Sequence, residues 1–218
     1  YRERFVNRPL LEGVNLKNKK VLELMCGSGG ITRYLIEQKA IVTGLDISQE
    51  LINIFREKWS CDAMCASIFS NGIADESFDC VVIVMGLHHL HPQVNEALEE
   101  IYRILKPGGY LCFCEPHGGS LPDVFRKLWY SADKYFEDNE AALDLKALKT
   151  RFSGKFEFKL EKYIGGMAYL FVLNSMIFRI PLNLKRLLSP VFLSIEGMFE
   201  RFPNRIFSCA SINQWRKK

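Results

Sequence analysis

The sequence contains no long apolar stretch, no internal repeat and no low-complexity segment. Its longest apolar run without a charge, residues 164–178, is interrupted by Gly, Asn and Ser and is shorter than the roughly 20 residues of a membrane-spanning helix. No signal peptide is visible, and the first residue is Tyr1 rather than a methionine, as in a shortened chain. These absences argue against solenoids, disordered tails and integral membrane proteins, and they predict a soluble, cytoplasmic protein.

The seven cysteines do not form the pattern of a disulfide framework or a metal site. Cys80, Cys112 and Cys114 lie in apolar runs, which indicates buried, reduced thiols in a cytoplasmic setting. Cys61 and Cys65 are four residues apart, but no second Cys or His pair at zinc spacing accompanies them. We therefore expect no metal.

The net charge of +4 is too small to indicate a nucleic-acid partner, but the charge is unevenly distributed. Residues 159–218 carry ten Lys and Arg against three Asp and Glu, whereas the rest of the chain carries nineteen against twenty-two. A basic C-terminal segment of this kind could meet anionic lipid or a phosphorylated substrate. The alternative interpretation is a solvated basic face.

With 218 residues, the chain is long enough for one substantial core and too short for two full α/β domains, so we expect a single domain over residues 1–218. Short apolar runs alternate with helical patterns as far as residue 115. We expect strands at 20–25, 40–45, 61–66, 78–85 and 110–115, with helices at 31–38, 48–58 and 93–105. This alternation predicts an α/β fold with a parallel, doubly wound sheet, which binds ligands at the carboxyl ends of its strands.

The second half of the chain is less regular. We expect helices at 121–136 and 140–152, a sixth strand at 156–164 and a seventh at 205–215. Between these two strands, residues 166–204 are apolar and basic. Three prolines divide this segment, so we expect two or three inserted helices there: Pro181, Pro190 and Pro203.

A glycine-rich loop follows the first expected strand. The segment Glu23-Leu-Met-Cys-Gly27-Ser-Gly29-Gly30 lies where that strand turns into a helix, and its glycines permit a tight turn and a close approach of a ligand. Its pattern, E-x-x-C-G-x-G, differs from the G-x-G-x-x-G of dinucleotide-binding proteins. Asp46 ends the next strand, where a carboxylate is well placed to bind a ribose diol.

Together these segments resemble the class I S-adenosylmethionine-dependent methyltransferases, in particular the group with ubiquinone- and sterol-type C-methylases and many small-molecule O- and N-methylases. The matching motifs are residues 21–29, 42–48, 75–82, 85–90 and 105–111, in the family's order and spacing. The resemblance implies a Rossmann-like sheet of seven strands, mostly parallel with the last strand antiparallel, and helices on both faces. A nicotinamide-dependent Rossmann enzyme is the alternative that this combination of motifs disfavours.

The resemblance also implies the cofactor, S-adenosylmethionine, with S-adenosylhomocysteine as its product. The implied cofactor-binding residues are Glu23, Gly27, Ser28, Gly29, Asp46, Ile47, Asp62, Ala63, Met85 and Gly86. The glycine loop would bind the methionine half, Asp46 both ribose hydroxyls, and Ile47 the adenine. Asp62 and Ala63, expected after strand three, would meet the adenine amino group, but the "L-P-F" segment usual in the family is replaced here by residues 64–73.

Methyl transfer requires an acceptor aligned with the sulfonium methyl and, where necessary, a base. Four histidines near the carboxyl ends of expected strands could act as that base, because histidine titrates near neutral pH: His88, His89, His91 and His117. His117, after strand five, is the preferred candidate on the substrate side, where Tyr130 and Tyr135 could line the same pocket. A structural hydrogen-bonding role is the alternative for His89.

The insert at 166–204 replaces the hairpin that is usual in the family. Apolar helices over the carboxyl edge of the sheet would form a cap for a hydrophobic or lipid-linked acceptor. Its interleaved bases, among them Lys185 and Arg186, would allow peripheral contact with an anionic membrane, such as the inner face of the cell membrane. The core of the cap or a dimer contact is the alternative, and the sequence leaves the oligomeric state open.

We therefore expect a methyltransferase for a small, hydrophobic or lipid-linked metabolite, with O- or N-methylation favoured over C-methylation because such acceptors are more numerous. One alternative is an RNA or protein methyltransferase. However, Met85-Gly-Leu-His88 replaces the Asn/Asp-Pro-Pro-Tyr/Phe signature of base methylation, and we expect no nucleic-acid partner. A second alternative is a non-catalytic cofactor-binding scaffold, which the intact loop and Asp46 disfavour.

Overall fold

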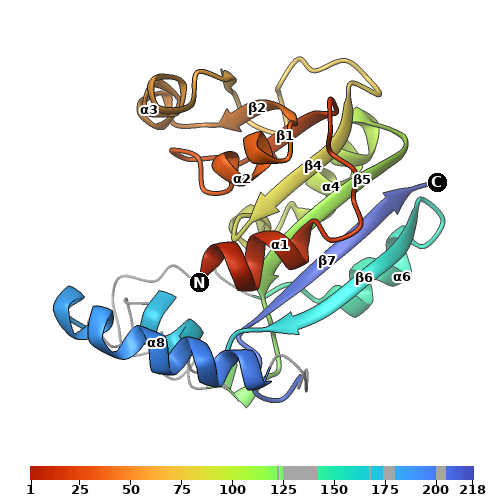
Figure 1. Ribbon diagram of the computed structural model, residues 1–218. Coiled ribbons are helices and arrows are strands. Elements are labelled where there is room, and N and C mark those ends of the chain that lie inside the picture. The colour runs from red at the N-terminus through yellow and green to blue at the C-terminus, as the bar shows by residue number, and fades with distance from the viewer. Residues whose placement is uncertain (122, 125–141, 167, 174–179, 200–204) are drawn as a thin grey trace.

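A seven-stranded sheet forms the centre of the molecule (Figure 1). The structure, a computed structural model, describes residues 1–121, 123–124, 142–166, 168–173, 180–199 and 205–218. The strand order is β3-β2-β1-β4-β5-β7-β6. The strands are β1 (Lys20–Leu24), β2 (Ile41–Asp46), β3 (Asp62–Cys65), β4 (Phe78–Val84), β5 (Leu105–Pro116), β6 (Phe156–Ile164) and β7 (Ala210–Lys217).

The topology of the sheet confirms the predicted fold class. Strands β1 to β5 pair in parallel, and β7 is antiparallel to both of its neighbours, β5 and β6. The chain runs outward from β1 to β3 and then returns to β4 on the other side of β1. This reversal places the carboxyl ends of β1 and β4 next to each other, where open α/β sheets bind ligands.

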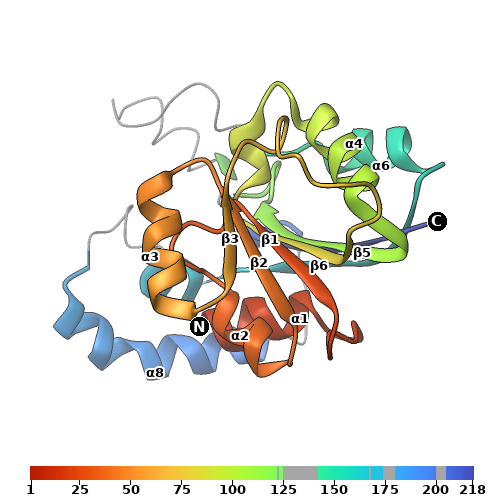
Figure 2. The same cartoon turned by 90° about the horizontal axis from the view of Figure 1, so that it is seen from above.

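Helices cover both faces of the sheet (Figure 2). One face carries α1 (Arg8–Leu10), α2 (Thr32–Glu37) and α3 (Gln49–Trp59), and the other carries α4 (Val94–Ile104) and α6 (Leu145–Phe152). Two apolar layers result. Phe113 and Trp215 lie in the layer toward α4 and α6, and Leu35 and Phe55 lie in the layer toward α2 and α3.

Local signals account for α3. Ser48 caps the helix by accepting a hydrogen bond from the backbone N–H of Leu51 at 3.3 Å, and Ser60 ends it in the left-handed region at φ +51°. Ile52 and Phe55 are fully buried on the inner face of the helix. The helix predicted over 48–58 is therefore confirmed, with a shift of one residue.

The start of β5 differs from the prediction. The Lys106-Pro-Gly-Gly109 segment was expected to be a turn before a strand at 110–115, but β5 begins at Leu105, which pairs with Phe78. The register between β4 and β5 then shifts, so the glycines belong to a bulge rather than to a free turn. A β-carbon at Gly109 would lie 3.0 Å from the carbonyl oxygen of Asp79, so the two strands need glycine at this point.

The insert contains helices, as expected from the two or three predicted over residues 166–204, but Pro190 does not end one of them. Its described part contains the short π-helix η3 (Tyr169–Leu173) and the 18-residue helix α8 (Leu182–Phe199), which continues through Pro190. A proline removes only one backbone hydrogen bond, and Pro190 lies on an exposed side of the helix. The last strand begins at Ala210 rather than at residue 205, because residues 205–207 form a turn.

A buried carboxylate ties α8 to the end of β6. Glu196 accepts hydrogen bonds from the backbone N–H groups of Gly166 (2.7 Å) and Ala168 (3.0 Å), and its side chain is buried. Phe171 of η3 and Phe192 of α8 stack with their ring centroids 5.0 Å apart. The insert therefore meets the sheet through a specific polar contact as well as through apolar packing.

The N-terminal segment forms helical structure that the sequence reasoning did not predict. The π-helix η1 (Arg2–Asn7) continues into α1; it buries Phe5 and Val6, and Val6 packs in the apolar layer on the α2 and α3 face of the sheet. Gln214 of β7 donates hydrogen bonds from Nε2 to the carbonyls of Leu10 (2.9 Å) and Glu12 (3.0 Å). The first residues of the chain are thus fixed to its last strand.

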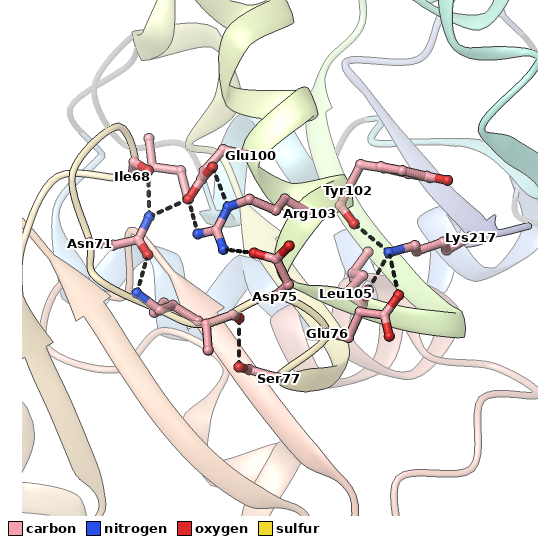
Figure 3. A network of polar contacts seen from close by, with 12 residues as sticks. Ile68, Asn71, Asp75, Glu76, Ser77, Glu100, Tyr102, Arg103, Leu105 and Lys217 are labelled. Carbon is pink, nitrogen blue, oxygen red and sulfur yellow. Dashed lines mark hydrogen bonds and ion pairs between the residues drawn. The ribbon is translucent and has the colours of Figure 1, made fainter.

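The segment between β3 and β4, where the chain departs from the family pattern, is held by a polar network (Figure 3). Asn71 donates from Nδ2 to the carbonyl of Ile68 at 2.6 Å and to Glu100 of α4 at 2.8 Å. Arg103 binds the same Glu100 and also Asp75. The loop is therefore fixed to α4 at the amino-terminal edge of the sheet, away from the glycine loop.

Candidate active site

The glycine loop has a backbone that only glycine adopts readily. Gly27 and Gly29 have φ values of +52° and +92°. A β-carbon at Gly29 would lie 2.0 Å from Nε1 of Trp59, because the indole packs on the loop and donates to the carbonyl of Ser28 at 2.9 Å. Burial raises the pKa of the neighbouring Cys26 thiol to about 12, so this cysteine stays protonated at neutral pH.

Asp46 holds this loop in place. Its Oδ2 accepts a hydrogen bond from the backbone N–H of Gly27 at 2.8 Å, and its Oδ1 accepts one from the backbone N–H of Ser48 at 3.0 Å. Each carboxylate oxygen can accept a second hydrogen bond. Asp46 can therefore bind a ribose diol while it keeps both backbone contacts.

Glu23 is a buried carboxylate beneath the same loop. It accepts hydrogen bonds from the backbone N–H of Ile31 at 3.1 Å and from the hydroxyl of Thr32 at 2.5 Å. Burial raises the pKa of Glu23 above its ordinary value, although these hydrogen bonds act in the opposite direction. The carboxylate thus anchors the start of α2 to the end of β1.

The adenine side of the expected site needs a correction. Asp62 and Ala63 were placed after strand three, but Asp62 begins β3 and pairs with Thr43, three positions before Asp46 on β2. The residue that pairs with Asp46 at the carboxyl end is Cys65. The strand predicted at 61–66 is confirmed at Asp62–Cys65, so the error lies only in the place after this strand that the family resemblance gave to Asp62 and Ala63.

Ile47 does lie at the correct edge. It follows Asp46 directly, and 76% of it is exposed, the largest exposed fraction among the large apolar side chains that the structure describes. An exposed isoleucine beside the carboxylate of Asp46 offers an apolar surface to a flat ring.

The tip of β4 is organised by Glu115, a residue that the sequence reasoning did not single out. Glu115 ends the buried part of β5 and is fully buried. Its Oε1 accepts the backbone N–H groups of Gly86 and Leu87, both at 2.8 Å, and its Oε2 accepts that of His88 at 3.3 Å. The available signal was an acidic residue at the end of an otherwise apolar strand, which needs donors if it is buried.

His88 completes this arrangement. Its Nδ1 lies 2.6 Å from Oε2 of Glu115, and the imidazole is buried in the 3₁₀-helix η2 (Leu87–Leu90). When Nδ1–H donates to the carboxylate, Nε2 keeps a lone pair and can accept a proton. His89, whose ring centroid lies 4.0 Å from that of His88, is exposed.

His117 belongs to a different group of side chains. Its ring contacts Tyr163 of β6 edge to face, with the centroids 4.5 Å apart, and the guanidinium of Arg205 lies over the same tyrosine. Burial, and then the charge of Arg205, lower the pKa of His117. The structure therefore brings His88 and His89 together at the β4 tip and places His117 with the end of β6.

The N-terminal segment adds a cation to the edge of the site. A β-carbon at Gly30 would lie 3.7 Å from Nη1 of Arg2, so this guanidinium reaches the glycine loop. Arg2 also lowers the pKa of the buried Cys114, although burial raises that pKa more strongly. Sequence reasoning could not assign Arg2, since its position depends on the fold of the N-terminal segment.

The remaining predictions from the sequence concern residues that lie outside this site. All seven cysteines are free, and within the described ranges no group of three His, Cys, Asp or Glu side chains could hold a metal ion. Tyr130 and Tyr135, expected in the substrate pocket, lie outside the described residues, as do parts of the insert. Among the described helices, none is both long and apolar enough to cross a membrane.

Comparison with known proteins identifies the domain. A methyltransferase domain family matches residues 22–113, which hold the glycine loop, Asp46 and the β4 tip. The chain is 33% identical over 144 residues to a malonyl-[acyl-carrier protein] O-methyltransferase of Enterobacter lignolyticus, covering 65% of this chain and 56% of that protein. It is 34% identical over 109 residues to a fatty-acid O-methyltransferase of Mycolicibacterium smegmatis, covering 46% and 38%.

A further relative is a phthiotriol/phenolphthiotriol dimycocerosates methyltransferase of Mycobacterium ulcerans, 35% identical over 107 residues, covering 47% of this chain and 39% of that protein. The chain thus spans between 38% and 56% of the length of these relatives.

Solved structures share the fold at low sequence identity. A SAM-dependent methyltransferase from Archaeoglobus fulgidus has a TM-score of 0.63 and 19% identity, covering 96% of this chain and 89% of that one. The [4+2]-cyclase SpnF has a TM-score of 0.64 and 19% identity, covering 97% and 80%. One fold therefore hosts different chemistries.

The motifs, the fold and the matching domain lead to one family. Residues 22–113 match a methyltransferase domain family, and the fold around them is shared with solved S-adenosylmethionine-dependent methyltransferases.

Proposed function

We propose that this chain transfers a methyl group from S-adenosylmethionine to a small, hydrophobic or lipid-linked acceptor, at oxygen or nitrogen rather than carbon. The observation that carries the proposal is the pair of carboxylates that organise neighbouring strand ends: Asp46 holds the glycine loop and Glu115 holds the β4 tip. The names of the relatives, which act on malonyl-acyl carrier protein, a fatty acid and phthiotriol dimycocerosates, support a lipid-like acceptor.

The residues of the loop fit the cofactor. The positive φ values of Gly27 and Gly29 leave the backbone of the loop open to the methionine half. Asp46 has lone pairs for both ribose hydroxyls, and Ile47 offers its exposed side chain to the adenine. Arg2 lies beside Gly30, where its guanidinium would pair with the carboxylate of the methionine half.

The β4 tip fits the reacting end. When bound, S-adenosylmethionine supplies an electrophilic methyl group. Met85 and Gly86 would line this end, and a β-carbon at Gly86 would lie 3.0 Å from the sulfur of Met25, so only glycine leaves the tip compact. Glu115 fixes Gly86 through its backbone N–H, and the N–H of Met85 donates to the carbonyl of Cys114, so the tip would hold the acceptor in line with the methyl group.

His88 is the base that this geometry favours. Glu115 orients the ring through Nδ1, so Nε2 can take the proton that the acceptor O–H or N–H loses as its bond to the methyl carbon forms. The carboxylate then stabilises the resulting imidazolium. His117, the candidate preferred from the sequence, has no such carboxylate contact among the described residues, and burial lowers its pKa.

A methyl-transfer assay tests the proposal. The chain is incubated with S-adenosylmethionine labelled in the methyl group and with dodecanoate, a malonyl thioester that carries a free carboxylate, and dodecylamine, and each product is extracted and counted. Label in the ester or the methylamine supports O- or N-transfer. Cofactor binding without label in any lipid-like acceptor would contradict the proposed acceptor class, and absent cofactor binding would contradict the activity itself.

We also propose that α8 contacts an anionic membrane surface. Its exposed apolar side chains follow helical spacing and form one stripe: Leu184, Leu187, Val191 and Met198. Lys185 and Arg186 flank this stripe, while Glu196, the acid of the helix, is buried. An apolar stripe beside bases without an exposed acid complements a negatively charged lipid surface. A cytoplasmic location at the inner face of the membrane remains a prediction.

Co-sedimentation with vesicles tests this contact. Wild-type chain should sediment with vesicles that contain phosphatidylglycerol and less with pure phosphatidylcholine, and high salt should weaken the binding. Leu187→Asp should abolish sedimentation, whereas Ile41→Asp, at an exposed isoleucine of β2, should not. Equal sedimentation of the Leu187 variant and the wild type would contradict the contact.

A further inference from the structure

A group of side chains lies at the carboxyl ends of β5 and β6, apart from the pair that His88 forms with Glu115. The ring of His117, just after β5, contacts the ring of Tyr163 of β6, and the guanidinium of Arg205 lies 4.9 Å from the centroid of the same tyrosine. The imidazole of His117 also hydrogen-bonds to the backbone of Arg205. Three segments that are far apart in the sequence therefore meet at this edge of the sheet.

Backbone hydrogen bonds hold the turn that carries Arg205. Cys209 follows this turn, and its carbonyl accepts a hydrogen bond from the N–H of His117 at 2.9 Å. The N–H of Cys209 donates to the carbonyl of Gly165, which follows β6, also at 2.9 Å. The segment before β7 is thus tied to the ends of both β5 and β6.

The guanidinium of Arg205 is accessible to an anion. Arg205 is exposed, and it forms no ion pair with any residue in the described part of the chain. The nearby acid, Glu161, is already used, because it pairs with Lys149 and accepts a hydrogen bond from the hydroxyl of Tyr163. A guanidinium that lies over an aromatic ring can still donate its N–H groups to a carboxylate at its edge.

Exposed apolar side chains border this cation. Ile206 and Phe207 directly follow Arg205, and they are 56% and 59% exposed. Leu121 is also exposed, and its N–H donates to the carbonyl of Ile206 at 2.7 Å, so the two segments lie side by side. An apolar strip beside a cation suits a ligand that combines a hydrocarbon chain with an anionic group.

The register of the sheet places this cation on the same face as the proposed base. Glu115 of β5 and Tyr163 of β6 both pair with Ser211 of β7, which lies between them. Residues that pair across neighbouring strands point to one face, and two strand spacings of about 4.8 Å put Glu115 and Tyr163 about 10 Å apart. Because Glu115 holds His88, the proposed base and Arg205 lie at one edge of the sheet, where β5 and β6 end (Figure 1).

We infer that Arg205 binds an anionic group of the methyl acceptor, which a hydrocarbon segment separates from the atom that accepts the methyl group. Tyr163 is a positioning residue, because its ring holds the guanidinium. The identity of this ligand as the acceptor rests on the proposed function, but binding of the anion can be measured without methyl transfer.

A matched pair of probes tests the assignment. Octanoate and octanamide have the same chain length and differ in charge. Isothermal titration of the wild type should give about tenfold tighter binding of octanoate, the effect of one hydrogen bond to a charged group. Arg205→Gln should bind both probes equally, and Arg205→Lys should keep part of the preference. Arg151→Gln, at an exposed arginine of α6, is the control and should keep all of it. An unchanged preference in Arg205→Gln would overturn the assignment.

Two substitutions of Tyr163 test its positioning role. Tyr163→Phe keeps the ring and removes only the hydroxyl that binds Glu161, so the preference for octanoate should remain. Tyr163→Leu removes the ring, and it should weaken octanoate binding several-fold while octanamide binding stays unchanged. Equal losses for the two probes in Tyr163→Leu would contradict the positioning role, because a merely structural defect does not distinguish them.

Titration with S-adenosylhomocysteine separates this inference from the proposed function. Every variant above should bind it as the wild type does, because none of the substitutions lies in the glycine loop. Absent binding in the wild type would contradict the proposed function and leave the octanoate result standing. A wild-type chain that binds S-adenosylhomocysteine but shows no preference for octanoate would contradict the inference alone.

Discussion

The imidazole of His88 and the carboxylate of Glu115 form a buried pair, with Nδ1 and Oε2 2.6 Å apart. The pair joins the tip of β4 to the end of β5, and the same carboxylate accepts three backbone N–H groups of the segment that follows β4. Glu115 therefore determines both the path of the backbone at the tip and the orientation of the histidine. The proposed base therefore depends on both strands, because Glu115 of β5 orients the histidine that follows β4.

Replacing His88 tests this role. His88→Gln keeps a polar side chain near Glu115 but has no group that titrates near neutral pH. We expect kcat for methyl transfer to fall about 100-fold while the affinity for S-adenosylhomocysteine stays unchanged. His89→Gln, at the exposed neighbour, is the matched control and should keep its kcat. If kcat fell in the His89 variant and stayed normal in the His88 variant, His89 rather than His88 would be the base, and the proposed role of His88 would be contradicted.

Asp46 should contribute to binding and to stability together. Asp46→Ala removes the proposed ribose contacts and also leaves the N–H groups of Gly27 and Ser48 without their acceptor. We expect at least a tenfold loss of S-adenosylmethionine affinity and a loss of about 1–3 kcal/mol in the free energy of unfolding, measured by urea denaturation. Asp62→Ala, at the opposite end of β3, should change neither quantity. If Asp62→Ala weakened cofactor binding, Asp62 would contact the cofactor despite its position at the start of β3, and the correction made above would be contradicted.

The two glycines of the loop should respond differently to alanine. Gly27→Ala meets no atom within 4 Å and carries only the cost of a left-handed backbone, about 1–2 kcal/mol. Gly29→Ala also collides with Trp59, so its free energy of unfolding should fall further. The double variant Gly29→Ala, Trp59→Ala removes the collision. Its loss of stability in thermal unfolding should therefore be smaller than the sum of the losses in the two single variants. Additive losses would exclude the steric account.

Glu23 gives a pH-dependent prediction. Burial raises its pKa above the ordinary value of 4.5, so the carboxyl group opposes folding increasingly as the pH rises from about 4.5 through the raised pKa. Glu23→Gln imitates the protonated form and can still accept from Ile31. At pH 7.5 the variant should therefore be more stable than the wild type by urea denaturation. The difference should shrink toward pH 4.5, and a difference independent of pH would contradict a raised pKa.

Local sequence patterns were sufficient to predict which residues lie at the carboxyl ends of the parallel strands. The apolar run of β1 ends at a glycine loop, Ser48 marks the start of α3, and the run at 78–84 marks β4. Each signal lies within a few residues of the element that it specifies, which is why the parallel core and the positions of Asp46 and the β4 tip follow from the sequence.

Features that depend on distant contacts could not be predicted in this way. Pro190 was expected to break a helix, but α8 continues because Glu196 and the stacked Phe192 hold it against other segments. The roles of Glu115 and Arg2 arise from neighbours that are far away in the sequence. Their residue types indicate charge, and only the fold shows what that charge binds.

The most direct test of the account is isothermal titration of the wild-type chain with S-adenosylmethionine. The geometry of Gly27, Gly29 and Asp46 predicts saturable binding of one molecule per chain, with S-adenosylhomocysteine competing for the same site. A folded chain that gives no saturable binding of either molecule would contradict the central claim.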